Sequence, residues 1–494
     1  MRSKFPSKLP PTHVLMSWLS AWADKVLLTD LPENRRWSYL YFSGALLVTL
    51  ASHTFVGNVK TSVFLDLVGT AQEPIAKSCV MAVLFPVTFF YSIAVSCVRS
   101  PRHLVTGVCV LYSVAFALIA AGLGAHRRSA VFEAWAMYYA VETSGVIVMP
   151  MIWSVVADVT PADLATKAFP AIFFAIQVGG ILGSLVSINV GSLGGEVGLL
   201  VLQVVCFVLI AVLAQRACVL ADDPDGENRP LLPDQRVPDS ERGASAAVPE
   251  QKATEGQVAA AAEPEPGPEQ SFLVRQLSQG MHGLWLLVSR PYVFGIFFVS
   301  YASLVPRTVL DYQNSVLAVD AFSTRQEQIA YFGRLNLWIN LGSAALTLVG
   351  TRPIVEFFGV GNTLMVLPVG LAVAVFALCA KHTVAMSTFS LVLACVLAYG
   401  LNSPCKEMLY VRTSKDIKYK AKSWSEWYGN QLMKLLGSQI NLWVNRETVS
   451  CGSHCFNSHA TGYIAGAWAL LWLVVAFTMG RHHTALEADN KIVT

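Results

Sequence analysis

The sequence predicts an all-α polytopic membrane protein, with about twelve transmembrane helices in two six-helix bundles. Apolar residues make up 54% of the 494 residues and charged residues only 14%, against about 25% charged residues in soluble domains. The apolar residues fall in long blocks, and one polar, acidic segment divides these blocks into two sets. This composition excludes a soluble enzyme, a nucleic-acid-binding protein and a disordered scaffold as descriptions of the whole chain, and it makes the lipid bilayer the expected surroundings.

The first set of blocks predicts the first bundle. A helix needs about 20 predominantly apolar residues to cross the hydrocarbon core, and six blocks approach or exceed that length, at residues 37–56, 75–98, 104–124, 132–157, 168–192 and 197–219. The first block opens with Trp37, Tyr39 and Tyr41, aromatic residues of the kind that gather at membrane interfaces. We therefore predict a bundle over residues 37–220, preceded by a cytoplasmic arm over residues 1–36.

The second set predicts the second bundle. Its six blocks cover residues 292–312, 329–350, 361–380, 383–404, 428–445 and 460–480. We expect a bundle over residues 271–480 and a cytoplasmic tail over residues 481–494. The block at 428–445 is the weakest because polar residues interrupt it, namely Asn430, Lys434, Gln439 and Asn441. Eleven spans is therefore the alternative count.

Residues 221–270 separate the two sets and have a different composition. They contain many prolines and roughly eight more acids than bases, a composition typical of disorder. We expect a flexible cytoplasmic linker. A plain tether and a regulatory or partner-binding segment are both open.

The distribution of Lys and Arg predicts the orientation. Cytoplasmic loops carry an excess of these residues. The first 36 residues and alternate loops are basic. Their Lys and Arg residues include Arg2, Lys4, Lys8, Arg99, Arg102, Lys167, Arg352 and Arg481. Arg127 and Arg128 break the alternation. We place both termini in the cytoplasm and expect no removable signal peptide.

Neither the cysteines nor the other reactive side chains form a pattern that indicates a cofactor. No CxxC pair or Cys/His metal spacing occurs, and only Cys451 and Cys455 lie together in a polar loop, where a disulfide is open. There is no Ser/His/Asp cluster, paired-carboxylate motif or P-loop. We expect no metal, no cofactor and no enzymatic activity.

Three ionisable residues within predicted spans are candidates for function, because charges are costly in a bilayer. Lys60 follows the first block and points into the bundle if that helix continues past Val56; otherwise it snorkels to the interface. Glu142 lies inside the fourth block and is a functional group or the partner of a base. Arg307 follows Pro306 in the seventh block and is either a ligand-binding or a structural cation.

The fifth block also contains closely spaced small residues. Gly179 and Gly183, with Gly180 and Ser184, form two small-xxx-small pairs, which permit close helix packing. We expect a structural role for them.

The most distinctive motif lies in a basic loop late in the chain. Residues 404–410 read Pro-Cys-Lys-Glu-Met-Leu-Tyr and include Lys406 and Glu407, and further basic residues follow up to Lys422. This sequence motif resembles the signature of the ATP:ADP antiporter family, the nucleotide transporters of obligate intracellular bacteria and plastid envelopes. Residues 152–160, which include Asp158, resemble a second family motif, and residues 289–292, 333–338 and 358–361 agree in order and spacing.

The resemblance implies a major-facilitator-like fold of twelve spans that moves nucleotides across a membrane, often by exchange. It also implies a monomer in the bacterial inner membrane with ATP, ADP or a similar nucleotide as substrate. Lys60 matches a lysine of the family's first span, and Glu142 matches its fourth-span acid if a one-residue gap is allowed. Lys406 or Lys420 matches a basic residue of the late signature.

Three positions depart from the family pattern. Pro306 stands where the seventh span of the family carries an acid, and Gly57 and Thr61 replace an arginine and an aspartate near Lys60. A triphosphate carries about three to four negative charges and needs several cations, with acids to orient them. A different nucleotide, a cofactor such as NAD, or another organic anion moved with protons are therefore alternatives to ATP/ADP exchange. A non-transporting sensor or assembly protein that acts through the linker is the alternative from another class.

Overall fold

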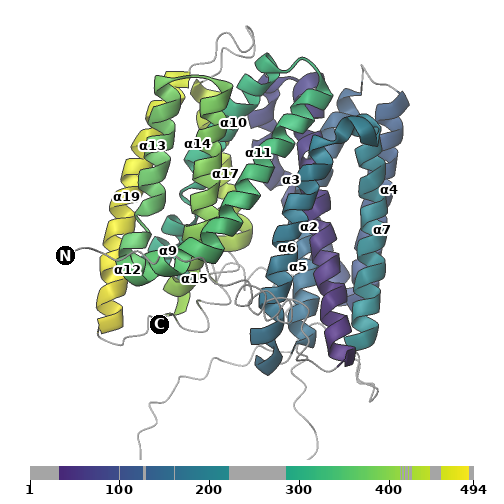
Figure 1. Cartoon of the computed structure of the whole chain (residues 1–494), viewed down its shortest axis with the longest axis horizontal. Helices are drawn as coiled ribbons and strands as arrows, with labels where there is room; N and C mark the ends of the chain where they lie inside the picture. The colour runs from purple at the N-terminus through teal and green to yellow at the C-terminus, as the bar shows by residue number, and fades with distance from the viewer. Residues whose placement is uncertain are drawn as a thin grey trace, which may run out of the picture.

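A computed structural model describes residues 33–98, 101–125, 130–160, 162–221, 285–411, 425–444 and 458–488, together with residues 413, 417 and 421. All secondary-structure elements in these ranges are helical (Figure 1). Almost all of the predicted arm and linker, the last six residues of the tail (489–494), Lys420, and the pair Cys451 and Cys455 lie outside the described residues.

The first half forms a bundle of six long helices, as the sequence predicts. They are α2 (Glu33–Leu67), α3 (Glu73–Cys97), α4 (Pro101–Ala125), α5 (Val131–Val159), α6 (Ala162–Ile188) and α7 (Gly195–Ala221). Helix α2 runs eleven residues beyond the predicted end at residue 56 (67 − 56). Those residues lower the average hydropathy because Asn58 and Ser62 are polar, yet both are buried.

The second half forms a bundle of more broken helices. Its elements are α9 (Pro291–Tyr301), α10 (Leu304–Ala321), α11 (Arg325–Ala345), α12 (Thr351–Thr363), α13 (Val366–Ala380), α14 (Val384–Leu397), α15 (Ser403–Val411), α17 (Asn430–Val444) and α19 (Ser458–Ala488). Helices α9 and α10 together form one long apolar segment, and α12 and α13 are bent by 81° at their junction. A π-helical turn, η4 (Ala398–Asn402), joins α14 to α15.

In the described ranges, nine helices are long and apolar enough to cross a membrane, or up to ten if the bent pair counts as one span. Helices α11 and α17 bring this to the twelve segments predicted (10 + 2). They are less apolar because part of their surface faces protein: Gln431, Ser438 and Asn441 of α17 are buried. The weakest predicted block is therefore a helix of the bundle.

Helices α2 and α6 approach each other closely at the predicted small residues. A Cβ atom on Gly179 would lie 2.3 Å from the carbonyl oxygen of Leu47, and one on Gly183 would lie 2.2 Å from that of Ala51. No side chain fits at these distances, so the two glycines are required for this packing. The predicted structural role of the small residues is confirmed.

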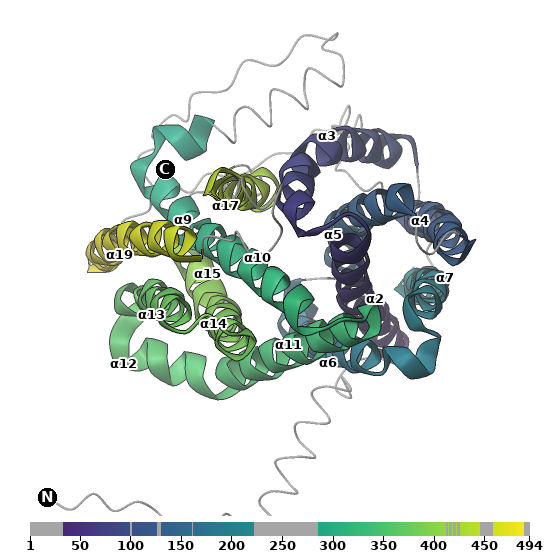
Figure 2. The same ribbon diagram turned by 90° about the horizontal axis from the view of Figure 1, so that it is seen from above.

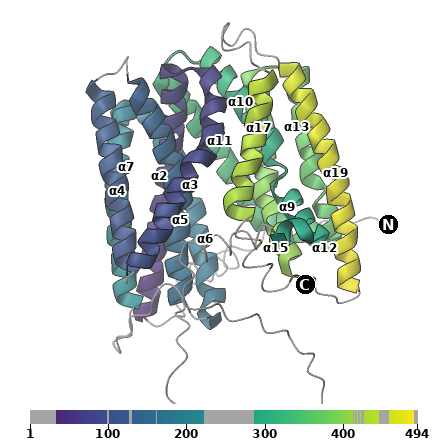
Figure 3. The same cartoon turned by 180° about the vertical axis from the view of Figure 1, so that it is seen from behind.

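The two halves meet along α11, which packs against α6 and α2, and along α17, which packs against α3. The view from above in Figure 2 separates the two groups of helices, and Figure 3 shows α3 beside α17. Hydrogen bonds between the halves gather where α2 ends and α11 begins. Asn58 accepts a hydrogen bond from Asn336 at 2.7 Å, and Ser62 donates one to the carbonyl of Arg325 at 3.1 Å. We call this region the closed end.

Candidate functional site

Lys60 and Glu142 form an ion pair inside the first bundle. The Lys60 Nζ atom lies 2.6 Å from Glu142 Oε1, so α2 and α5 are joined by a charge-assisted bond. The ammonium also lies 4.4 Å from the centroid of the Tyr138 ring, within the range of a cation–π interaction. Lys60 is only 8% exposed, which contradicts the snorkelling alternative and agrees with the interior position that a longer first helix predicts.

A second ion pair crosses between the two halves. Lys77 of α3 lies 3.0 Å from Glu73 and 2.6 Å from Asp311 of α10. None of these three residues is among the candidates predicted from the sequence. The signal was present for two of them, because Lys77 and Asp311 are charged residues within predicted spans.

Arg307 belongs to the same region but pairs with an aromatic ring. Its guanidinium carbon lies 4.8 Å from the centroid of Tyr399, and its Nη2 donates a 2.6 Å hydrogen bond to the Tyr399 hydroxyl. Tyr399 is 45% exposed and lies in the π-helical turn η4; such turns often mark functional sites. Arg307 is one helical turn from Asp311 on α10, so both lie on one face.

Lys434 of α17 supplies a fourth cation. The charged groups close enough to interact with it electrostatically are Glu142, Arg307, Lys60 and Lys77. Within the described part of the chain, Lys434 forms no ion pair. From the sequence, Lys434 was interpreted only as one of the polar residues that interrupt its span. The structure adds that this lysine interacts electrostatically with the other charged residues of the region.

These residues together form one charged cluster, which we call the cation cluster: Lys60, Lys77, Arg307, Lys434, Glu73, Glu142 and Asp311. Four bases and three acids give it a formal net charge of +1 (4 − 3). Helices α2, α3 and α5 of the first half and α10 and α17 of the second half contribute to it. A site that is shared by two bundles and has an excess of cations is suited to an anionic ligand.

A separate group of charges lies at the closed end. Arg325, at the start of α11, bonds to Asp66 at the end of α2 and lies 3.4 Å from Glu196 at the start of α7. A capping box formed by Thr324 and Glu327 fixes the start of α11. We call Arg325, Asp66 and Glu196 the Arg325 latch, because they tie the second half to two helices of the first.

Other predicted site residues lie elsewhere. Asp158 is exposed near the end of α5, sixteen residues beyond Glu142, which corresponds to about 24 Å along a helix. Lys406 pairs with Glu426 at 3.2 Å and lies 5.6 Å from the ring centroid of Tyr301. Glu407 belongs to α15, but its side chain is outside the described residues, as is Lys420. The roles predicted for these four residues stay predictions.

Comparison with known proteins identifies the fold. No protein-family model matches the sequence, and no curated protein matches it either. One similar solved structure is a POT family transporter in complex with 5-aminolevulinic acid, with 11% identity and a TM-score of 0.58 over 88% of this chain and 96% of that chain. A second is a bacterial homologue of the iron transporter ferroportin in an inward-facing state, with 14% identity and a TM-score of 0.57 over 90% of this chain and 98% of that chain. A third is a D-xylose-proton symporter, with 13% identity and a TM-score of 0.54 over 90% of this chain and 97% of that chain.

This similarity extends over nearly the whole length of both chains and confirms the predicted fold, a polytopic membrane protein with two helical bundles like those of major-facilitator transporters. At identities below 15% the likeness concerns the fold alone. The resemblance to the ATP:ADP antiporter family rests on the sequence motifs.

Proposed function

We propose that this protein is a secondary transporter that moves nucleotides across a membrane by alternating access between its two bundles. The observation that carries the proposal is the excess of cations in a cluster built by both halves. Sites shared by two bundles near the bilayer midplane are typical of secondary transporters. The bundle architecture that this chain shares with known transporters supports the same function.

The arrangement of charges in the cation cluster fits a polyanion. Lys60 is neutralised by Glu142, and Lys77 by Glu73 and Asp311. Arg307 and Lys434 form no ion pair within the described residues and are free to meet phosphate oxygens. Arginine offers a fork of donors and lysine a point charge, and both are common phosphate-binding groups.

The motif resemblance makes nucleotides the favoured polyanion. The family's acid in the seventh span is absent at Pro306, but the same segment brings Asp311 to the cluster, five residues later. An acid that orients a cation is therefore present, although at a different position. Helix α15, which carries Lys406, lies at the end of the molecule opposite the closed end (Figure 1), and we propose that its basic residue attracts the substrate there.

Alternating access requires contacts that one state makes and the other lacks. The Arg325 latch and the hydrogen bond from Asn336 to Asn58 are such contacts, because they join the two halves at the closed end. With both termini in the cytoplasm of a cell-membrane protein, the closed end is extracytoplasmic and the conformation is inward-facing.

Uptake into proteoliposomes tests the proposal. Purified protein is reconstituted and assayed with labelled nucleoside mono-, di- and triphosphates and NAD, with and without internal nucleotide. We expect saturable uptake of at least one nucleotide, and stimulation by internal nucleotide if transport is exchange. Lys434→Ala should reduce uptake at least about 100-fold, because it removes a charged contact to phosphate that is worth roughly 3 kcal/mol.

The matched control is Lys381→Ala, since Lys381 follows α13 in an exposed turn. That variant should transport as the unaltered protein does. A protein that is folded and reconstituted but accumulates no nucleotide under either condition would overturn the proposed function.

A further inference from the structure

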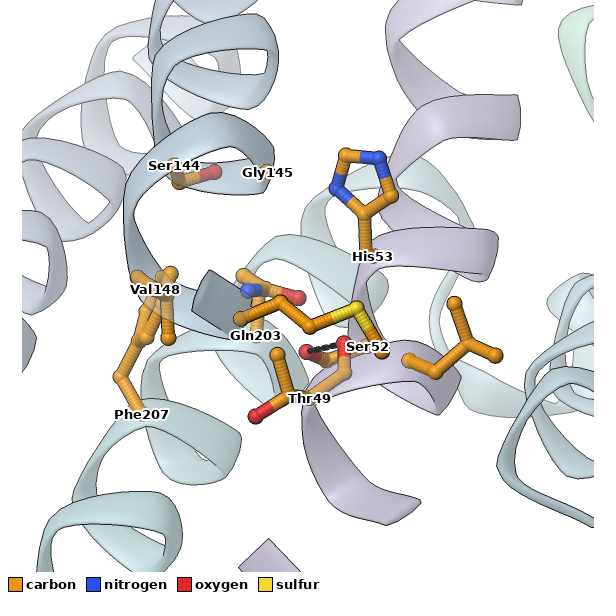
Figure 4. Close-up of a pocket in the computed structure, with 10 residues that line it drawn as sticks. Thr49, Ser52, His53, Ser144, Gly145, Val148, Gln203 and Phe207 are labelled. Carbon is orange, nitrogen blue, oxygen red and sulfur yellow. Dashed lines mark hydrogen bonds between the residues drawn. The ribbon is translucent and has the colours of Figure 1, made fainter. Parts of the chain in front are cut away.

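His53 is a titratable residue beside the cation cluster. It forms no ion pair with the other residues that the structure describes. It lies seven residues before Lys60 on α2, so both side chains are on the same face of the helix. A Cβ atom on Gly145 of α5 would lie 2.4 Å from His53 Cε1. Figure 4 shows the imidazole directed toward the helix that carries Ser144 and Gly145. Since Glu142 is one turn earlier on that helix, the imidazole and the Lys60–Glu142 pair share the contact between α2 and α5.

A small pocket with a mostly apolar lining and several polar residues adjoins His53. It has a volume of about 30 Å³ and lies between α2, α5 and α7; its polar lining residues are Thr49, Ser52, His53, Ser144 and Gln203. This volume fits about one water molecule. The Oε1 atom of Gln203 is buried and has no hydrogen-bond partner among the described residues, so the pocket offers an acceptor as well as hydroxyl groups. The pocket is therefore large enough to hold a water molecule that could exchange a proton with the imidazole.

The charges around His53 depend on what occupies the cation cluster. Glu142 from α5 attracts a proton on the imidazole, while Lys60 from α2 and Lys434 from α17 repel it. Helix α7 presents only the neutral Gln203. Because Glu142 is already paired with Lys60, two cations oppose one shared acid. Burial of the imidazole opposes the proton as well. A bound polyanion neutralises the two cations and thereby makes protonation of the imidazole more favourable than it is in the empty site.

We propose that His53 takes up a proton when a polyanionic substrate enters the cation cluster and releases it when the substrate leaves, so that anion and proton move together. The inference rests on the proposed function and adds proton symport to it. One imidazole nitrogen gains the proton from water on entry and returns it to water on exit. No covalent bond to the substrate is made or broken.

Linkage gives the direction of the pH effect. If anion binding favours the protonated imidazole, protonation must strengthen anion binding by the same factor. The affinity for the anion should therefore rise as pH falls from 8 to 6, by about fivefold or more, the low end of typical coupling between two sites.

Calorimetry on the purified full-length protein measures the linkage. Binding heats for ATP, ADP and inorganic pyrophosphate are compared at pH 7 in two buffers of different ionisation enthalpy, which yields the number of protons taken up per anion. The unaltered protein should take up a fraction of one proton. His53→Gln should take up less, and its affinity should be nearly independent of pH after correction for the phosphate groups of the ligand. His103→Gln is the matched control, because His103 is exposed on α4.

The outcomes separate the two proposals. Retained anion binding by His53→Gln at pH 8, equal to that of the unaltered protein, shows that the variant is folded. Proton uptake with pyrophosphate, lost in His53→Gln, supports the inference even if no nucleotide is transported, in which case only the proposed function fails. Equal proton uptake in His53→Gln and the unaltered protein, or no proton uptake with any of the three anions, overturns the inference whether or not transport occurs.

Discussion

Two groups of charges join the halves of this protein, and their balances are opposite. The Arg325 latch sets one cation between two acids, Asp66 and Glu196. The cation cluster sets four bases against three acids and leaves Lys434 without an ion pair among the described residues. In the latch, Arg325 is paired with both acids in this conformation. The cluster has one more base than acids, so a bound anion would lower its electrostatic energy. One region is therefore suited to hold a state, and the other to bind a ligand.

Both regions join the two halves and both include a residue of α2, Lys60 in the cluster and Asp66 in the latch, so we expect their equilibria to be linked. Binding energy from an anion in the cluster can shift the population of the latch only as far as the two states differ in affinity. Substitutions that affect one region without the other should reveal this division of roles.

The largest effect should come from breaking the ion pair inside the first bundle. Lys60→Ala leaves the partly buried charge of Glu142 without its ion-pair partner, and Lys434 and His53 compensate for it only in part. We expect a loss of about 2 kcal/mol in the free energy of unfolding, below the range for a fully buried pair, together with loss of nucleotide uptake. Thermal unfolding in detergent measures the first effect.

The double variant Lys60→Ala/Glu142→Ala provides the comparison. It should recover part of the lost stability, because no unpaired charge remains, and it should not recover uptake. If the double variant is less stable than Lys60→Ala, the unpaired charge of Glu142 is not what destabilises Lys60→Ala.

A smaller effect is expected at the Arg325 latch. Arg325→Ala removes bonds to two acids, but Asp66 is 42% exposed and solvent screens its attraction, so we expect the loss to be about 1.4 kcal/mol in total. The change should shift the protein toward a state that is open at the closed end. The reactivity of Ser62→Cys toward a membrane-impermeant maleimide reports this opening, in a background whose accessible native cysteines are replaced by serine. We expect labelling to be at least about tenfold faster, corresponding to 1.4 kcal/mol.

The control for this experiment is Arg102→Ala on α4, which is remote from α11 in the sequence and belongs to the first bundle alone. Unchanged labelling in Arg325→Ala would mean that the latch does not hold the closed end.

The smallest effect should follow Tyr399→Phe. This change removes the hydrogen bond from Arg307 but keeps the aromatic face beneath the guanidinium. We expect a two- to tenfold weaker affinity for the anion, in line with about 0.5–1.5 kcal/mol for one hydrogen bond. Calorimetric titration with ADP measures it, and Tyr399→Ala, which also removes the ring, should cost more. Equal affinities of the two variants would show that the stack has no part in holding Arg307.

The sequence predicted the interior charges of the first bundle better than those of the second. Lys60 and Glu142 stand out because each is the only Asp, Glu, Lys or Arg in a long stretch of sequence, residues 37–65 and 134–157 respectively. Lys434 was missed because its helix also carries Gln431, Ser438 and Asn441, and these polar residues together resemble a poor span. Mean hydropathy averages over all faces of a helix and does not report that one face is turned to protein.

Composition and block lengths alone determined the membrane class, the two sets of six helices and the small residues at which α2 and α6 pack. These features depend on the solvent and on local spacing, which a sequence records directly. Only the tertiary structure decided that Lys77, Asp311 and Lys434 join Lys60, and that His53 lies beside Glu142. Those contacts join residues up to 374 positions apart (434 − 60), and the packing of helices from both halves brings them together.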